Sequence, residues 1–299
     1  MSILVVGSIA LDTIETPYGN APNSPGGSAL YFSAAARFFS PVNVVGVVGE
    51  DFPFDCIDFL KNDRVNLDGL MVEKGQTFRW GGRYHENINE RDTLFTYLNV
   101  FENFHPVIPD QYRNSDFLFL ANIAPELQLE VLENVNSPKL TVLDTMNFWI
   151  SGRPEALAKV IERADVMIVN DEEIIQLTGI QNIHRAAKDL LSRGLKGLVV
   201  KKGEHGAVMI TRDDYFVAPG FPVEKVVDPT GAGDSFAGGF VGYLASANQL
   251  DNNSFRKAVV YGSTVASYNV EDFSFNKLKT LTPEMIESRF EAFREMMRF

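Results

Sequence analysis

The stretch that decides the fold is VVDPTGAGDSFAGGF, residues 226–240, which reads as an extended segment, a glycine turn and a helix of small and apolar residues. Gly231 and Gly233 lack a Cβ and can adopt positive φ, so backbone N–H groups there can surround an anion. A helix that begins near Ala232 also points the positive end of its dipole at the same place. We therefore expect an anion hole formed by Gly231, Ala232 and Gly233.

Asp234 stands in the first turn of this expected helix, beside the anion hole rather than within it. A carboxylate next to a bound phosphate is well placed to take a proton from an attacking hydroxyl, which predicts phosphoryl transfer with Asp234 as general base. We expect its pKa to need little change, because the ionised carboxylate is already the active form at pH 7. The alternative is structural, since acids complement helix dipoles and glycines often precede helices.

Two familiar nucleotide-binding patterns do not fit: G-x-G-x-x-G would need glycine where Phe236 stands, and G-x-x-x-x-G-K-[ST] does not occur. Residues 228–236 (DPTGAGDSF) instead resemble D-[TS]-[TV]-G-A-G-D-x-F, the signature of the ribokinase (PfkB) carbohydrate kinase family, with Pro229 unusual within it. The resemblance implies an ATP-dependent kinase that transfers the γ-phosphate to a hydroxyl of a sugar or nucleoside. It also implies an α/β fold with a doubly wound, mostly parallel sheet, helices on both faces and a small antiparallel β lid.

The hydrophobic pattern independently favours a parallel sheet. Apolar runs at residues 3–6 and 42–48, and the later runs FLFLAN, LTVLD, VMIVN and GLVVKKG, alternate with helical stretches. Repeated β-α units of this kind predict parallel strands joined by right-handed crossovers. No repeat or linker interrupts them, so we expect a single domain over residues 1–299. Residues 77–99 read as a hairpin inserted into this pattern, and the resemblance places a lid at about 13–22 and 75–100.

Composition limits the classes of partner. The chain has 299 residues, 45% of them hydrophobic, and a formal net charge of −12, which argues against nucleic acid or an anionic membrane as the main partner. The single cysteine, Cys56, excludes an internal disulfide and fits a reducing compartment. No apolar stretch approaches the length of a membrane span or a signal peptide. We therefore expect a cytoplasmic protein.

Four substrate-binding residues are expected near the first strand. Asp12 follows the strand at residues 3–6, at the edge where a parallel sheet places its ligands, and the resemblance assigns it to substrate hydroxyls. Gly26 and Gly27 resemble the family's G-G-x-x-x-N-x-A motif, in which glycines let the substrate approach the backbone. Tyr31 replaces the motif's asparagine, and it is either ordinary core packing or a sign of a flat acceptor such as a nucleobase.

The remaining expected site residues follow later strands. Asp144 to Asn147 (DTMN) resembles a D-x-N pattern near the family's cleft and makes Asn147 a substrate-binding candidate, and N-x-x-E at Asn170 and Glu173 resembles the motif that positions Mg²⁺. Magnesium keeps most of its waters, so these two side chains would act through water. The nucleotide-binding candidates are Lys202, Gly203, Gly206 and Asp228, of which Asp228 would also help to organise magnesium and water.

Several alternatives remain at this point. Arg79, Arg83 and Arg91 of the lid are either solvated strand charges or groups that meet a phosphate. The resemblance also raises a monovalent cation as a further cofactor, and a homodimer that pairs the sheets of two lids. The competing function is a nucleotide- or sugar-binding sensor or scaffold of the same fold that has lost catalysis. The intact Asp234 argues against it, because binding alone does not require that base.

Overall fold

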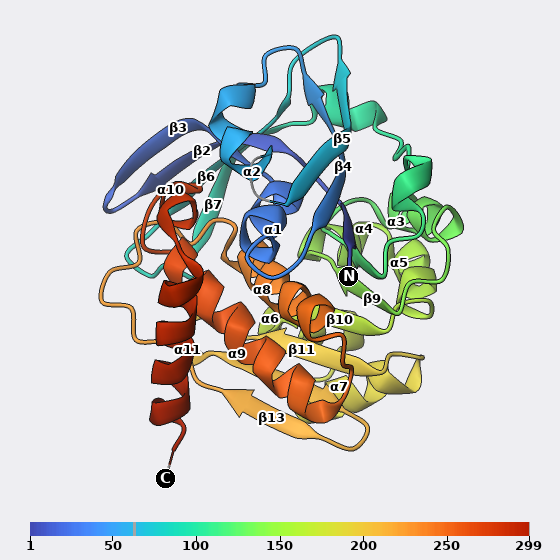
Figure 1. The fold of residues 1–299 in the computed structure, drawn as a ribbon, viewed down its shortest axis with the longest axis vertical. Helices are drawn as coiled ribbons and strands as arrows, with labels where there is room; N and C mark the ends of the chain where they lie inside the picture. Colours follow the sequence, from blue (N-terminus) through green and yellow to red (C-terminus); the bar gives the residue numbers. More distant parts are fainter. Residues whose placement is uncertain (62–63, 299) are drawn as a thin grey trace.

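The computed structural model describes residues 1–61 and 64–298, so the last residue of the expected domain, Phe299, lies outside the described residues. Within them, a nine-stranded sheet runs through the molecule (Figure 1) in the order β13-β12-β11-β10-β9-β8-β1-β4-β5. Its strands are β1 (Ile3–Val6), β4 (Val42–Gly49), β5 (Val65–Glu73), β8 (Phe117–Leu120), β9 (Leu140–Asp144), β10 (Val166–Asn170), β11 (Gly197–Lys201), β12 (Ala207–Thr211) and β13 (Tyr215–Ala218). All neighbours are parallel up to β11, and β12 and β13 pair antiparallel, which confirms the predicted mostly parallel sheet.

The sheet is buried on both faces because its inner strands are almost wholly apolar, and β1 and β8 are apolar at every position. In β1, Ile3 and Val5 join one hydrophobic cluster while Leu4 and Val6 join the other. The first cluster is covered by α1 (Ser28–Ala36), α2 (Asp58–Lys61), α8 (Ala232–Ala247), α9 (Asn252–Asn269), α10 (Asn276–Thr280) and α11 (Pro283–Met296). The second is covered by α3 (Pro125–Glu133), α4 (Asn147–Gly152), α5 (Pro154–Ile161), α6 (Asp171–Thr178) and α7 (Ile183–Ser192). Short 3₁₀ turns lie at η1 (Phe54–Ile57), η2 (Asn99–Asn103), η3 (Asp110–Tyr112) and η4 (Gly203–His205). The doubly wound arrangement is thus confirmed.

A second, smaller sheet projects from one end of the main sheet. Its order is β3 (Gly19–Gly26), β2 (Ala10–Thr16), β6 (Phe78–Tyr84) and β7 (Arg91–Tyr97). The hairpins β2–β3 and β6–β7 are antiparallel as expected, but β2 and β6 join them in parallel, so the small sheet is mixed. We refer to these four strands as the lid sheet.

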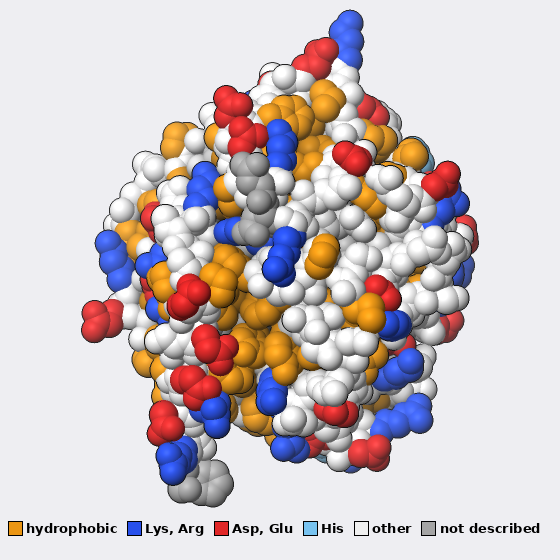
Figure 2. All heavy atoms as spheres, in the orientation of Figure 1, with side chains coloured by type: hydrophobic (Ala, Val, Ile, Leu, Met, Phe, Trp, Pro, Cys, Tyr) orange, Lys and Arg blue, Asp and Glu red, His pale blue; other side chains and the backbone are white. Residues whose placement is uncertain are grey.

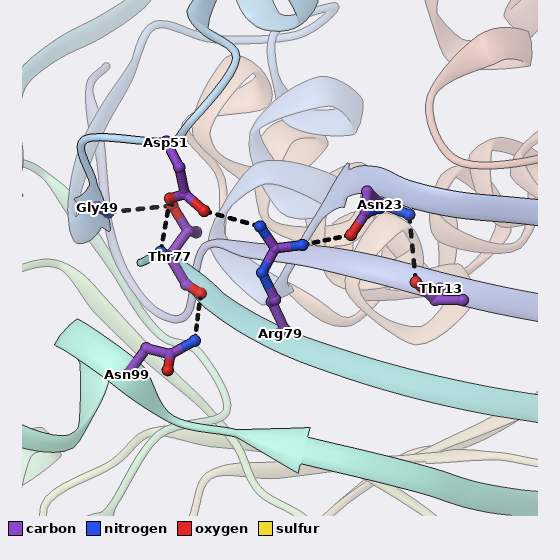
Figure 3. Close-up of polar contacts among 7 residues, drawn as sticks. All are labelled: Thr13, Asn23, Gly49, Asp51, Thr77, Arg79 and Asn99. Carbon is purple, nitrogen blue, oxygen red and sulfur yellow. Dashed lines mark hydrogen bonds and ion pairs between the residues drawn. The ribbon is translucent and has the colours of Figure 1, made fainter. Parts of the chain in front are cut away.

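A chain of polar contacts ties the lid sheet to the end of β4 (Figure 3). The Asp51 carboxylate accepts hydrogen bonds from the backbone and hydroxyl of Thr77, both at 2.7 Å, and from the Arg79 guanidinium at 2.7 Å. Arg79 also donates to Asn23 of β3, and the backbone of Gly49 donates to the Thr77 hydroxyl. Burial opposes ionisation of Asp51, yet these donors hold its pKa below the usual value. The positive charge of Arg79 is therefore neutralised by Asp51, where the lid sheet joins the end of β4.

Charged side chains of both signs are spread over the face shown in Figure 2. Acidic and basic side chains are interspersed over that face, with no continuous basic patch (Figure 2). Among the described residues, every helix is too short or too polar to pass through a bilayer.

Candidate active site

The glycine turn before α8 is packed tightly between two side chains. Gly231 precedes the helix with φ 72°, a left-handed conformation that suits glycine, and a Cβ added there would lie 2.3 Å from ring carbons of Tyr31. A Cβ added to Gly233 would lie 2.8 Å from the Nζ of Lys201. Ala232 begins the helix and Asp234 stands in its first turn. The turn therefore has glycine where its neighbours leave no space for a side chain.

Asp12 is buried on β2 next to Gly26, and its surroundings favour the protonated carboxyl. It is 4% exposed, and burial, followed by the charges of Asp228 and Asp234, raises its pKa to about 8. Gly26 makes room for it, since an added Cβ would lie 2.0 Å from the Asp12 Oδ2. The Tyr31 ring is buried beside them, which favours a role in core packing. Burial, followed by the charges of Asp228 and Asp12, raises the pKa of the Tyr31 hydroxyl.

Gly27 and Asp228 shape the backbone around Asp12. Gly27 precedes α1 with φ 92°, and an added Cβ would lie 2.5 Å from the carbonyl oxygen of Ser8. The Asp228 carboxylate accepts from the backbone N–H of Thr230 at 2.9 Å and of Ser274 at 3.3 Å. Asp228 thus anchors the glycine turn to the segment after α9, and it lies on the Asp12 side of the site.

On the other side of the turn, three acids surround one lysine. Lys201 Nζ lies 3.9 Å from the Asp144 carboxylate, and its charge also acts on Glu173 and Asp234. Burial raises the pKa of Glu173 to about 7, and burial followed by the charge of Asp144 raises that of Asp234 to about 7. The expectation that Asp234 has a near-ordinary pKa is wrong, because the site buries it among other acids.

The expected magnesium residues form a capping box at the start of α6. Asn170 Oδ1 accepts from the Glu173 backbone at 2.7 Å, and Glu173 Oε2 accepts from the Asn170 backbone at 2.8 Å. Within residues 1–61 and 64–298, no three or more His, Cys, Asp or Glu side chains could hold a metal ion together. The donor set fits magnesium held through water, because Asp144, Glu173 and Asp234 outweigh the charge of Lys201.

A cavity of about 430 Å³ opens beside the glycine turn and extends toward α9. Its lining includes Lys201, Gly203 and Gly206, together with Ala232 and Gly233 of the turn. Two larger hollows, of about 680 and 520 Å³, lie against β5 and beside α7, away from these groups. The volume of the 430 Å³ cavity and the glycine turn and helix start at one of its ends suit a nucleotide.

Of the expected nucleotide-binding residues, Gly203 and Gly206 line this cavity, whereas Lys202 and Asp228 are not among its described lining residues. The lysine that lines the cavity and faces Gly233 is Lys201, the neighbour of Lys202 in the chain. Asn147 is exposed at the start of α4. Asp144, three residues earlier, is buried next to Lys201 instead.

Comparison with known proteins agrees with this geometry. The family model described as pfkB family carbohydrate kinase matches residues 2–279. The chain belongs to the pfkB carbohydrate kinase family.

Individual relatives cover most of the chain. It is 29% identical over 257 residues to a cytidine kinase of Thermococcus kodakarensis, covering 84% of this chain and 91% of that protein. Two solved structures share the fold: a ribokinase of Arabidopsis thaliana complexed with ribose and ATP (TM-score 0.77, 19% identity, 97% and 98% of the two chains), and a nucleoside kinase of Burkholderia thailandensis with inosine (TM-score 0.78, 20% identity, 97% of each). The predicted class, an ATP-dependent kinase acting on a sugar or nucleoside, is confirmed.

The pfkB signature located the glycine turn, but two groups beside it were not assigned a role. Asp144 ends β9 and Lys201 ends β11, so each carries a charged group at the carboxyl edge of the sheet. Both residues could have been recognised as site candidates, because each is a charged residue at the end of an apolar strand.

Proposed function

We propose that this pfkB kinase phosphorylates a nucleoside. The observation that carries the proposal is Trp80, which pairs with Asp12 across β2 and β6. Paired residues in neighbouring strands point to the same face of a sheet, so the indole lies beside the carboxyl that would bind hydroxyls. A Cβ added to Gly82 would lie 2.1 Å from the indole, so the ring lies flat along the lid sheet. The Arg91 guanidinium lies over the ring at 5.0 Å from its centroid, and a nucleobase would take this place or stack beside it. The similarity to a cytidine kinase also favours a nucleobase here.

Two of the three lid arginines are already neutralised by carboxylates. Arg79 is paired with Asp51 at 2.7 Å, and Arg83 with Glu15 at 2.6 Å. A phosphate on the acceptor would need a cation that is not already neutralised. Arg79 and Arg83 are therefore poor phosphate ligands, whereas Arg91, whose guanidinium carbon lies 5.0 Å from the Trp80 ring centroid, is the lid cation nearest the proposed acceptor site.

Each residue has a role in the proposed transfer. The Asp12 carboxyl, protonated at pH 7, can both donate to and accept from acceptor hydroxyls. Asp234 takes the proton of the attacking hydroxyl, and the backbone N–H groups of Gly231, Ala232 and Gly233 stabilise charge on the transferred group. Of these, the Ala232 N–H also donates to the Pro229 carbonyl at 3.2 Å. Lys201 contacts the phosphates, a role we had expected for Lys202. Magnesium, held through water by Asn170 and Glu173, would neutralise phosphate charge.

A monovalent cation remains part of the proposal. Asn269 is fully buried at the end of α9, its Nδ2 donates to the Thr230 carbonyl at 2.9 Å, and its Oδ1 has no hydrogen-bond partner among the described residues. An unpaired oxygen beside the glycine turn fits a weakly held cation. Turnover should therefore rise when potassium replaces a bulky organic cation in the buffer.

We also propose that residues 1–299 act as one cytoplasmic domain, with a lid at about 13–22 and 75–100. The lid sheet supports the last point, because its strands come from 10–26 and 78–97.

ADP release with a panel of cytidine, adenosine, inosine, ribose, fructose, fructose phosphates and inositol tests the acceptor. Trp80→Leu should raise the KM for nucleosides roughly tenfold, about 1.4 kcal/mol of lost stacking. Tyr97→Leu, an exposed aromatic on β7, is the matched control and should leave that KM unchanged. Turnover of sugars alone would replace the nucleoside proposal, and release of no ADP with any acceptor would favour the non-catalytic alternative.

A further inference from the structure

The far end of the nucleotide cavity is mostly apolar. Away from the glycine turn, its walls are Phe221, Val223, Ala266 and Val270, with Ser263 and Ser267 on the α9 side. A flat heterocycle fits such a surface, and any polar atom at its edge would meet few partners. The hydrogen bonds that these serine hydroxyls already make therefore influence which base the cavity can bind.

The Ser267 hydroxyl is already engaged on two sides. Its Oγ donates to the carbonyl oxygen of Thr264 at 2.8 Å and accepts from the Arg289 guanidinium at 3.0 Å. A serine hydroxyl has one proton and two lone pairs. With the proton given to Thr264 and one lone pair used by Arg289, a single lone pair is left for a ligand.

Arg289 is held rigidly in the position that makes this bond. Its guanidinium carbon lies 3.3 Å from the Tyr268 ring centroid and 4.5 Å from that of Phe221, and its NH2 pairs with Glu271 at 2.7 Å. It therefore supports two walls of the cavity, Phe221 by stacking and Ser267 by hydrogen bonding. Arg289 comes from α11, which lies beyond residues 2–279 that match the family model and runs beside α9 (Figure 1).

We propose that Arg289 and Ser267 select the base of the phosphoryl donor. The hydroxyl can accept a hydrogen bond from an exocyclic amine, as in adenine, but must give up its bond to Thr264 to donate to a carbonyl at the same position, as in hypoxanthine. Ser267 is thus a specificity-determining residue and Arg289 a positioning residue. The inference rests on the proposed use of this cavity for the donor nucleotide.

Calorimetric binding of ADP and IDP, which differ at this amine and carbonyl, tests the proposal without requiring turnover. The wild-type protein should bind ADP roughly tenfold more tightly than IDP, as expected for one hydrogen bond gained against one lost. Ser267→Ala and Arg289→Met should each reduce this ratio severalfold. In turnover with ATP and ITP, the change should appear in the donor KM and leave kcat unaltered.

Two matched controls separate selection from general damage. Ser263→Ala removes a hydroxyl from the same wall without the Arg289 bond, and it should weaken ADP and IDP equally. Arg294→Met removes an exposed arginine of α11 and should leave both affinities unchanged. An ADP/IDP ratio that is the same in wild type, Ser267→Ala and Arg289→Met overturns the proposal, as does failure of the wild type to discriminate. Discrimination without transfer to any nucleoside would leave the inference standing and refute only the proposed function.

Discussion

Asp234 holds its proton up to about neutral pH, so turnover should depend on pH near that value. A general base acts only when ionised, and kcat/KM should therefore rise as pH increases through about 7. Asp234→Asn should lower kcat by about 10²–10⁴-fold, the usual contribution of such a base, with nucleotide affinity retained. Rate profiles from pH 5.5 to 8.5 and ADP titrations measure both. Near-normal turnover in the variant would place the base elsewhere, and an unfolded variant would favour the helix-dipole alternative.

Asp12 should act on the acceptor and not on ATP. Asp12→Ala removes one or two hydrogen bonds to acceptor hydroxyls, each worth roughly 1–3 kcal/mol. The acceptor KM should rise at least tenfold while the KM for ATP changes little, which initial-rate measurements with each substrate varied in turn can show. An equal rise in both would assign Asp12 to the scaffold.

The adjacent lysines show how far single residues could be predicted. The sequence places Lys201 and Lys202 equally close to the nucleotide loop, yet side chains alternate at a strand end, so only one of them faces Gly233. Choosing between them requires the last strand residue and its neighbours, which no local motif specifies. The raised pKa of Asp234 is similar, since it depends on burial in the folded protein and then on the charges of Asp144 and Glu173, which are distant in the chain.

At the scale of elements, we expect the β6–β7 hairpin to cover both the acceptor side and the nucleotide side of the site. Its turn reaches the nucleotide loop: Asn89 Nδ2 donates to Glu204 at 2.9 Å, and Ile88 and Asn89 line the nucleotide cavity. Deleting residues 87–92 should admit water and raise ATP hydrolysis relative to transfer. Asn89→Ala should do the same more weakly, with Asn136→Ala, an exposed amide far from the lid, as control. Measuring ADP and phosphorylated product together gives the ratio, and an unchanged ratio would contradict a lid role.

Elements were more predictable than their contacts. The β1 range, residues 3–6, matches its fully apolar run. The start of α11 is also readable from local sequence, because Thr282 caps the helix and Pro283 stands in its first turn, where both residue types are favoured. The parallel pairing of β2 with β6 was not predicted, because it joins residues 68 positions apart, such as Asp12 and Trp80, whose local patterns indicate only hairpins. The contacts of Arg289 in α11 with Phe221 and Ser267 of the cavity wall were missed for the same reason.

For the whole molecule, the proposed homodimer would bury the outer side of the lid sheet. Phe95 and Tyr97 stack there at 5.0 Å on the edge strand β7, and Tyr97 is 56% exposed. Such an aromatic edge can pair with a second copy. Sedimentation equilibrium should give a dimer mass, and Tyr97→Glu should shift it toward monomer, whereas Tyr215→Glu, equally exposed on β13, should not. A monomeric wild type would remove the dimer proposal.

The site should also make the free protein less stable as pH rises. Asp12 titrates at about 8 and Glu173 and Asp234 at about 7 when folded, all above their unfolded values, so the folded state binds more protons between about pH 4 and 8. The free energy of unfolding must then fall with increasing pH in that window, by about 1.4 kcal/mol per pH unit for each extra proton. Urea unfolding at pH 5.5 and 8 without nucleotide should show this loss. Asp12→Asn has no such proton to lose, so its loss should be smaller than that of the wild type by at least about 1 kcal/mol, and an equal loss in both proteins would show that Asp12 is not protonated in the folded state.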